Sequence, residues 1–398
     1  MNSPNRVSPT QSFMQARMTR DFAAAERIGN AMVAAQPGHS FARRGLARMF
    51  DELDRREEAL PHWQALHAAS RKDFEAAYRV AQSMRQGGGS VDRVAADLAP
   101  DAAFAENLRA VLDNPPTTAP KEGTHNVVIC GVSYCGSTLF DRLLGSLPGV
   151  ASVGESHWLV KGKVPGAGYD VLDFSRDFAA DMVKCSVCGK NCTALTAEFR
   201  RGLAADRTNW YFRIAERLGA QTLVAGDKNP AKILDNDPLL RFDALLLFKS
   251  LPQAWWSELQ KRKPGHDEAY YLAECERYIG TWCQNYAMFL ESFSPQGKMV
   301  AVSFEEFTRA PVRVLRAACE ALSLPFDEQV LKFAKPGHAI GGNDRAVRRL
   351  KTADYAPDIT PLEPPPLPDS HRHLIQKSAE VKRVFSLLQT AHERTMKG

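Results

Sequence analysis

A glycine-rich segment at residues 131–138, GVSYCGST, has the residue types and spacing of a phosphate-binding site. Gly131 and Gly136 keep the G-x-x-x-x-G spacing of a Walker loop, and Ser137 and Thr138 add two hydroxyl groups. The backbone N–H groups of such a loop, at the start of a helix, favour anions. A glycine turn that only opens a helix is the alternative, because short glycine patterns also arise without a ligand.

Ser137 occupies the position at which a Walker loop has its lysine. That lysine reaches the outer phosphates of a nucleoside triphosphate, and its charge is central to phosphoryl transfer. The loop therefore predicts binding of a terminal 5′-phosphate rather than hydrolysis of a triphosphate.

The elements around the loop indicate how it is held. A β-branched apolar strand is expected at residues 127–130, directly before the loop, and a helix at 138–147, directly after it. Further strands, separated by long helical stretches such as 268–292, are expected at 222–225, 244–248 and 299–303. Strands that alternate with helices predict an α/β fold, with a parallel sheet that carries the P-loop-like loop. Beyond it, residues 356–368 are expected to be extended and 373–396 to form a last helix.

The N-terminal region has a different pattern. Residues 21–112 are rich in Ala, Arg, Glu and Leu at helical spacing and are predicted to be all helix. An offset of 34 residues, the tetratricopeptide period, superposes Ala42 on Ala76 and Leu46 on Val80. An ordinary helical bundle fused to an enzyme is the alternative interpretation.

Three regions are therefore predicted along the chain. Residues 1–113 form the helical, tetratricopeptide-like region, and the proline-rich residues 114–124 form a linker. Residues 125–398 form the α/β domain, and we expect residues 1–113 to be separable from the nucleotide site.

Composition and charge indicate which kinds of partner, and which cellular compartment, are expected for the protein. The 398 residues include 51 Lys and Arg against 46 Asp and Glu, and the resulting charge of +5 suits an anionic small molecule at least as well as nucleic acid, so charge alone does not decide between them. Residues 1–20 lack the apolar stretch of a signal peptide, and no run approaches the roughly 20 apolar residues that cross a bilayer. We expect a cytoplasmic protein with no membrane span and no nucleic-acid partner.

Several segments, in order, resemble the sulfotransferases that use 3′-phosphoadenosine 5′-phosphosulfate (PAPS). The loop and the following Gly154-Glu155 resemble the family's 5′-phosphosulfate loop and its sequel, and residues 226–230, GDKNP, resemble its D-K-x-P segment. Lys249 and Ser257 stand eight residues apart, as do the basic residue and serine that hold the 3′-phosphate in that family. Residues 302–307 and 337–345 resemble its later strand-to-helix and nucleotide-capping segments.

The resemblance implies transfer of a sulfuryl group from PAPS to a hydroxyl or amine of an acceptor. The acceptor could be a carbohydrate, a lipid, a peptide tyrosine or a small metabolite, and the helical repeats could hold a protein partner. The PAPS-binding residues that the resemblance implies are Tyr134, Cys135, Gly136, Ser137, Thr138, Leu139, Lys249, Ser257, Gly342, Asn343 and Arg345.

The chain departs from the family pattern at two cationic positions. Tyr134 stands where the loop usually has a basic residue, and Lys249-Ser250 replaces the usual Arg-Asp. Lysine offers a point charge instead of a bidentate fork, so weaker binding of the 3′-phosphate is expected. Lys228 and Arg345 could supply compensating charge.

Catalytic roles also follow from the resemblance. Lys228, the lysine of the D-K-x-P segment, is expected to stabilise the charge that develops on the leaving bisphosphate. Glu155 matches the place of the general base in several branches of the family, and His157 is the alternative base. A surface or helix-capping carboxylate and a packed histidine are the structural alternatives for these two residues.

Cys185, Cys188 and Cys192 have the C-x-x-C-G-x-x-C spacing of half a zinc knuckle. A structural zinc normally takes four ligands, and no second C-x-x-C is present to complete the site, although His157 could come from elsewhere in the fold. Reduced cysteines that pack an insert are the alternative, and no metal is expected among the catalytic residues.

Two functions from other classes compete with the sulfotransferase. A small-molecule kinase or nucleotide hydrolase could use the same loop, but the missing lysine at Ser137 counts against it. A nucleotide-binding interaction scaffold built on the helical repeats is the other alternative. The presence of Glu155, Lys228, Lys249 and Ser257 together favours catalysis.

Overall fold

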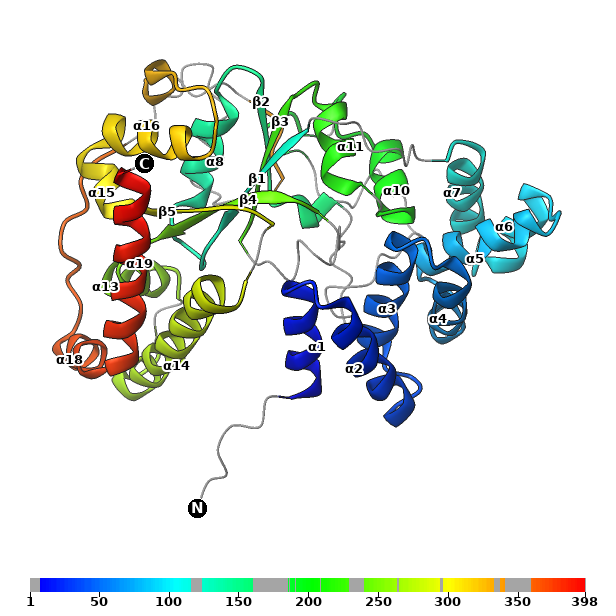
Figure 1. Ribbon diagram of the computed structural model, residues 1–398, viewed down its shortest axis with the longest axis horizontal. Coiled ribbons are helices and arrows are strands. Elements are labelled where there is room, and N and C mark those ends of the chain that lie inside the picture. Colours follow the sequence, from blue (N-terminus) through cyan, green and yellow to red (C-terminus); the bar gives the residue numbers. More distant parts are fainter. Residues whose placement is uncertain are drawn as a thin grey trace. The chain divides into compact units, whose positions relative to one another are not determined.

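The computed structural model in Figure 1 divides the chain into two compact units. The first comprises Met1–Gly123, Glu155–Leu218 and Ala231–Leu240, and the second comprises Thr124–Gly154, Gly219–Pro230 and Arg241–Gly398. Within them the structure describes residues 8–115, 124–159, 185, 187–189, 191–207, 209–228, 240–262, 265–293, 296–332, 337–340 and 359–397. The capping residues Gly342, Asn343 and Arg345 lie outside the described residues.

The N-terminal part of the first unit is helical, which confirms the all-helix prediction for residues 21–112. Aspartate side chains begin several of its helices: Asp21, Asp73 and Asp101 each accept a hydrogen bond from the backbone N–H three residues later. Its elements are α1 (Pro9–Met18), α2 (Phe22–Ala35), α3 (Ser40–Glu52), α4 (Arg56–Ala69), α5 (Phe74–Gln86), α6 (Val91–Leu98), α7 (Ala102–Asp113), η1 (Ser156–Leu159), α10 (Ala197–Ala205) and α11 (Trp210–Arg217).

Helices α3 and α5 begin 34 residues apart, at Ser40 and Phe74. The superposed residues Ala42 and Ala76 are both fully buried, and Leu46 and Val80 are both buried as well. The offset therefore reproduces helix starts and core positions. Membership of the tetratricopeptide class stays a prediction.

Buried charges join α10 to the N-terminal helices within the first unit. Arg79 on α5 donates to Asp206 at 2.9 Å, and Asp206 is only 1% exposed. Arg201 donates to Asn107 on α7 at 2.7 Å. Residues 197–206 thus belong to the same packed body as α5 and α7, while the predicted domain boundary at 114–124 stays a prediction.

The second unit is built on a five-stranded parallel sheet, which confirms the predicted α/β class. The strands follow the order β2-β3-β1-β4-β5, so β1 lies in the middle between β3 and β4. In the register, Val127 of β1 faces Val224 of β3 and Asp243 of β4. The strands are β1 (His125–Cys130), β2 (Val150–Gly154), β3 (Thr222–Lys228), β4 (Phe242–Phe248) and β5 (Gln296–Ser303).

Helices cover this sheet through a continuous apolar core. Side chains of β1, β3, β4 and β5 pack against Phe140, Phe307 and Leu315 from three different helices, and Figure 1 shows those helices gathered beside the strands. The helical elements are α8 (Ser137–Gly145), α13 (Leu251–Leu259), α14 (Glu268–Ala287), the π-helical η2 (Met288–Ser292), α15 (Phe304–Arg309), α16 (Pro311–Ala321), η3 (Glu328–Leu331), α18 (Asp369–Lys377) and α19 (Ala379–Lys397).

Two elements differ from the predictions. Strand β2 was not expected; it pairs with β3, and its last residue, Gly154, also forms a parallel bridge with Ile340. The last helix is two helices, because Ser378 ends α18 and its hydroxyl then accepts from the N–H of Val381 in the first turn of α19. In the described part of the chain, no helix combines the length and the apolar character that a membrane crossing requires.

Candidate anion-binding site

The carboxyl ends of the parallel strands bring the predicted site residues to one edge of the sheet. The glycine loop (residues 131–136) follows β1, Lys228 ends β3 and Lys249 follows β4. Because β3 and β4 are the two neighbours of β1, one lysine is delivered on each side of the loop. Crevices at the carboxyl ends of such sheets are where α/β proteins bind ligands.

The loop departs from extended backbone at defined residues. Gly131, Tyr134 and Gly136 have φ angles of 148°, 65° and 101°. Gly136 is the N-cap of α8 and offers no side chain, so the cap makes no side-chain hydrogen bond to the helix. The first backbone N–H groups of a helix generally have no acceptor within it.

The two loop glycines are required by space as well as by φ. A Cβ on Gly131 would stand 2.5 Å from the carbonyl oxygen of Leu247, and a Cβ on Gly136 would stand 2.2 Å from the ring of Phe304. Both distances are shorter than any carbon contact that a protein tolerates. The loop therefore lies directly on β4 and on the start of α15.

Tyr286 of α14 fastens the loop to β4. Its buried hydroxyl donates to the carbonyl of Leu247 at 3.0 Å and accepts from the N–H of Val132 at 3.5 Å. On the other side, the N–H of Gly131 donates to the carbonyl of Lys228 at 3.1 Å. The loop is thus tied to both neighbouring strands before any ligand binds.

The loop side chains divide between core and surface. Cys135 is fully buried in the apolar core, so only its backbone can meet a ligand. Burial raises the pKa of this thiol, while the ammonium groups of Lys228 and Lys249 lower it. Both lysines therefore lie near the loop. Ser137 is buried at the start of α8, whereas Thr138 and Leu139 are half-buried.

Lys249 is held in a largely buried environment. It is 9% exposed, and its Nζ lies 4.6 Å from the centre of the Phe304 ring, in a cation–π contact. Burial lowers the pKa of Lys249, and the nearby Glu305 opposes that shift. The same glutamate accepts from the N–H of Ser250 at 2.8 Å, which fixes the start of α13.

Ser257 lies two turns into α13 and is half-buried. Its hydroxyl donates to the carbonyl of Gln253, one turn earlier, at 2.9 Å. That bond is local, so the hydroxyl can be redirected to a ligand without opening the core.

Tyr134 stands among charged groups, two of which, Glu258 and Arg262, the sequence did not identify. Burial raises the pKa of its phenol, Glu258 raises it further, and the cations Lys228 and Arg262 lower it. Arg262 pairs with Glu258 at 3.1 Å and also with Glu274. A guanidinium is therefore present beside the loop position that lacks a basic residue.

Tyr278 of α14 is a further polar group near the loop. Burial raises the pKa of its phenol, and Glu258, Cys135 and Tyr134 raise it further. The buried hydroxyl has no hydrogen-bond partner in the described part of the chain. Neither Arg262 nor Tyr278 belongs to a motif, so no sequence signal points to them.

The two candidate bases follow β2 in the chain. Glu155 comes directly after Gly154, the last residue of that strand, and is half-buried. His157 lies in η1, and its side chain lies outside the described residues. Both residues belong to the first unit.

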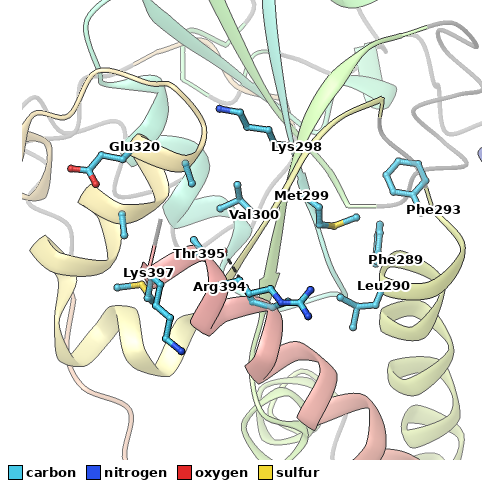
Figure 2. A pocket seen from close by; sticks show the side chains of 14 residues that line it. Phe289, Leu290, Phe293, Lys298, Met299, Val300, Glu320, Arg394, Thr395 and Lys397 are labelled. Atoms are coloured by element: carbon cyan, nitrogen blue, oxygen red, sulfur yellow. Dashed lines mark hydrogen bonds between the residues drawn. The ribbon is translucent and has the colours of Figure 1, made fainter.

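A cavity of about 870 Å³ lies elsewhere in the second unit (Figure 2). It is bounded by η2, β5, α16 and α19, and its lining combines Phe289, Phe293 and Met299 with the cations Lys298 and Arg394. Neither the loop nor Lys228 or Lys249 lines it. It is therefore separate from the anion-binding site.

Comparisons with known proteins give one structural likeness. No protein-family model matches the chain, and no curated protein matches it either. Among solved structures, a sulfotransferase from Alicyclobacillus acidocaldarius is 17% identical, covers 68% of this chain and 96% of its own, and superposes with a TM-score of 0.34. So loose a superposition assigns neither a fold nor a function.

Proposed function

We propose that the chain is a sulfotransferase that moves a sulfuryl group from PAPS to an acceptor hydroxyl or amine. One observation carries the proposal: the strand order puts Lys228 and Lys249 at the ends of the two neighbours of β1, on either side of a glycine loop that itself lacks a lysine. A cofactor with anionic groups at both its 5′ and 3′ positions matches a site with two separated cations.

The loop is suited to the 5′-phosphosulfate. Its backbone is held by Tyr286 and by the Lys228 carbonyl, through the N–H groups of Val132 and Gly131, so the loop is in place before an anion binds. Ser137 and Thr138, the first two residues of α8, are proposed to add hydroxyl donors at the helix start. In this proposal Tyr134 contributes its backbone, and Lys228 supplies the charge that the loop sequence omits, since Arg262 is paired with Glu258 and Glu274.

The 3′-phosphate is assigned to Lys249 and Ser257. Lys249 follows β4, and Ser257 lies on the helix that starts beside it. A buried ammonium is poorly hydrated, so an incoming phosphate has little water to displace from it. Gly342, Asn343 and Arg345 are proposed to close over the nucleotide.

In the reaction, the acceptor oxygen forms a bond to sulfur as the bond from sulfur to the 5′-phosphate oxygen breaks. The bonding electrons pass to that phosphate oxygen, and adenosine 3′,5′-bisphosphate leaves. Lys228 stabilises the negative charge that grows there. Glu155 takes the proton from the acceptor, so charge and atoms balance.

Binding measurements separate this function from the alternatives. By calorimetry, the chain should bind adenosine 3′,5′-bisphosphate more tightly than AMP or ATP. Lys249→Ala and Ser257→Ala should each weaken binding of the bisphosphate and leave AMP binding nearly unchanged. Equal losses for both nucleotides would remove the 3′-phosphate assignment, and a preference for ATP would favour a kinase or hydrolase.

Catalytic roles are tested by turnover. Glu155→Gln should lower turnover by about a hundredfold to ten-thousandfold with little change in bisphosphate affinity, as expected for loss of a general base. Lys228→Ala should reduce both quantities. His157→Ala is the matched control: if it abolishes turnover while Glu155→Gln keeps most of it, the imidazole is the base. Hydrolysis of PAPS to the bisphosphate is the readout until an acceptor is known.

A further inference from the structure

Three cysteine thiols of the first unit converge on one point. The Sγ atoms of Cys185, Cys188 and Cys192 lie within 4.8 Å of one another. A tetrahedral zinc with bonds of 2.3 Å separates its sulfur ligands by about 3.8 Å, so the spacing is close to that of a metal site. None of the chain's cysteines is disulfide-bonded.

The backbone around the first two thiols has the shape of a metal-binding turn. Cys185 and Gly189 form an antiparallel bridge, in which the N–H of Gly189 donates to the Cys185 carbonyl at 2.9 Å. Gly189 has a φ of 66°, a left-handed conformation that favours glycine. The N–H of Cys188 points at the sulfur of Cys185 at 3.4 Å. An N–H directed at a sulfur stabilises it as a thiolate, the form that binds metal.

The third thiol has the same kind of support. The N–H of Leu195 donates to the sulfur of Cys192 at 3.3 Å. Arg217 on α11 donates to the carbonyls of Thr193 and Ala194 at 2.9 and 2.7 Å, which fixes the chain directly after Cys192. The position of Cys192 is therefore set by the fold and not by the cysteines alone.

Charge balance also fits a divalent cation. Three thiolates and one Zn²⁺ leave a net charge of −1. The buried guanidinium of Arg200 lies close enough to Cys192 and Cys185 for their charges to act on it. A cation in the second shell of this kind offsets the residual charge.

We propose that Cys185, Cys188 and Cys192 bind a structural zinc ion, with one nitrogen or oxygen ligand in the fourth position. The donor set is soft, and a site made of cysteines selects zinc over the hard cations. The ion would lock the turn at 185–192 onto the segment that leads into α10. This inference is independent of the proposed sulfotransferase activity.

Metal analysis of the full chain, purified without added metal or a histidine tag, tests the site. We expect about one zinc per chain by mass spectrometry, and X-ray absorption should show three sulfur ligands. A stoichiometric content of iron, two or four sulfur ligands, or a metal-free protein with three titratable thiols at these positions would each overturn the proposal.

Variants assign the zinc to these thiols. Cys188 is exposed, so Cys188→Ser leaves the core intact. It should lower zinc affinity by more than about a hundredfold, since loss of an outer-shell partner alone costs 10- to 100-fold. Cys275→Ala, a buried thiol on α14, is the control and should keep its zinc. A chelator should lower the melting temperature of the wild type and of Cys275→Ala but not that of Cys188→Ser. Equal zinc affinity in Cys188→Ser and the wild type would refute the assignment.

Discussion

Replacing Gly136 by alanine tests whether the glycine loop is built against Phe304. At this position φ is 101°, and the new Cβ would stand 2.2 Å from a ring carbon of Phe304. Gly219 provides the matched control in the same unit, because its φ is 66° and no atom lies within 4 Å of its added Cβ. Gly219→Ala therefore carries backbone strain alone, whereas Gly136→Ala carries strain and a clash.

The expected loss of stability in each variant follows from the backbone strain and the clash. A left-handed alanine costs about 1–2 kcal/mol, which is the whole expected effect of Gly219→Ala. The Phe304 ring is buried and packs on Phe307 at a centroid distance of 6.0 Å, so it has little room to move. Overpacking of this kind adds about 1–3 kcal/mol. Gly136→Ala should thus be the more destabilising variant by about 1–3 kcal/mol.

Scanning calorimetry measures the difference, since each kcal/mol shifts the melting temperature by about 2–4 °C in a domain of 150–250 residues. Phe304 also lies under the ammonium of Lys249, so a displaced ring moves that cation. Gly136→Ala should weaken binding of adenosine 3′,5′-bisphosphate by more than about tenfold, or 1.4 kcal/mol. Equal melting temperatures for the two variants would refute the packing of the loop, and unchanged affinity would refute its link to Lys249.

Two further predictions concern buried charge. The pKa of Lys249 is lowered by burial, so the folded protein loses this proton at a lower pH than the unfolded chain does. As pH rises toward the ordinary lysine pKa, bisphosphate affinity measured by calorimetry should fall while the free energy of unfolding rises. Lys249→Arg should remove the fall in affinity. If Lys249→Arg has the same pH dependence of affinity as the wild type, the assignment to Lys249 is wrong. Burial alone would raise the pKa of Glu75, but the guanidinium groups of Arg48 and Arg207 outweigh it and hold that pKa well below the usual range. Glu75→Gln should lower the free energy of unfolding, measured with urea near neutral pH, by about 3–5 kcal/mol. This loss should shrink as pH falls through the depressed pKa of Glu75. A stability difference between variant and wild type that does not depend on pH would contradict the ion-pair account.

Elements with strong local patterns were predictable from the sequence. The apolar runs at 244–248 and 299–303 became β4 and β5, because such runs bounded by turns are typical of buried parallel strands. Strand β2, with the sequence VASVG, has no such run. It exists because its backbone pairs with β3, and a pairing between distant segments leaves no mark in either one alone.

The candidate site was predictable only in its local parts. The loop, Lys228 and Lys249 belong to short motifs beside strands, so spacing identified them. Arg262 and Tyr286 reach the loop from the end of α13 and from α14, about 130 and 150 residues further along the chain. Burial of Glu75 was equally hidden, because the arginines that pair with it come from distant parts of the chain, Arg48 on α3 and Arg207 after the end of α10.

The loop lacks a lysine of its own, but the strand order brings two lysines from other segments to its two sides. A Walker loop carries its cation within its own sequence, whereas here Lys228 ends β3 and Lys249 directly follows β4, the two neighbours of β1. Each cation is then fixed by a strand, and Lys249 also by the ring of Phe304. Cations carried on two different strands are matched to a ligand that has two separate anionic groups. This arrangement favours a bisphosphate nucleotide over a triphosphate, and the comparison of adenosine 3′,5′-bisphosphate with ATP is therefore the measurement on which the proposed function depends.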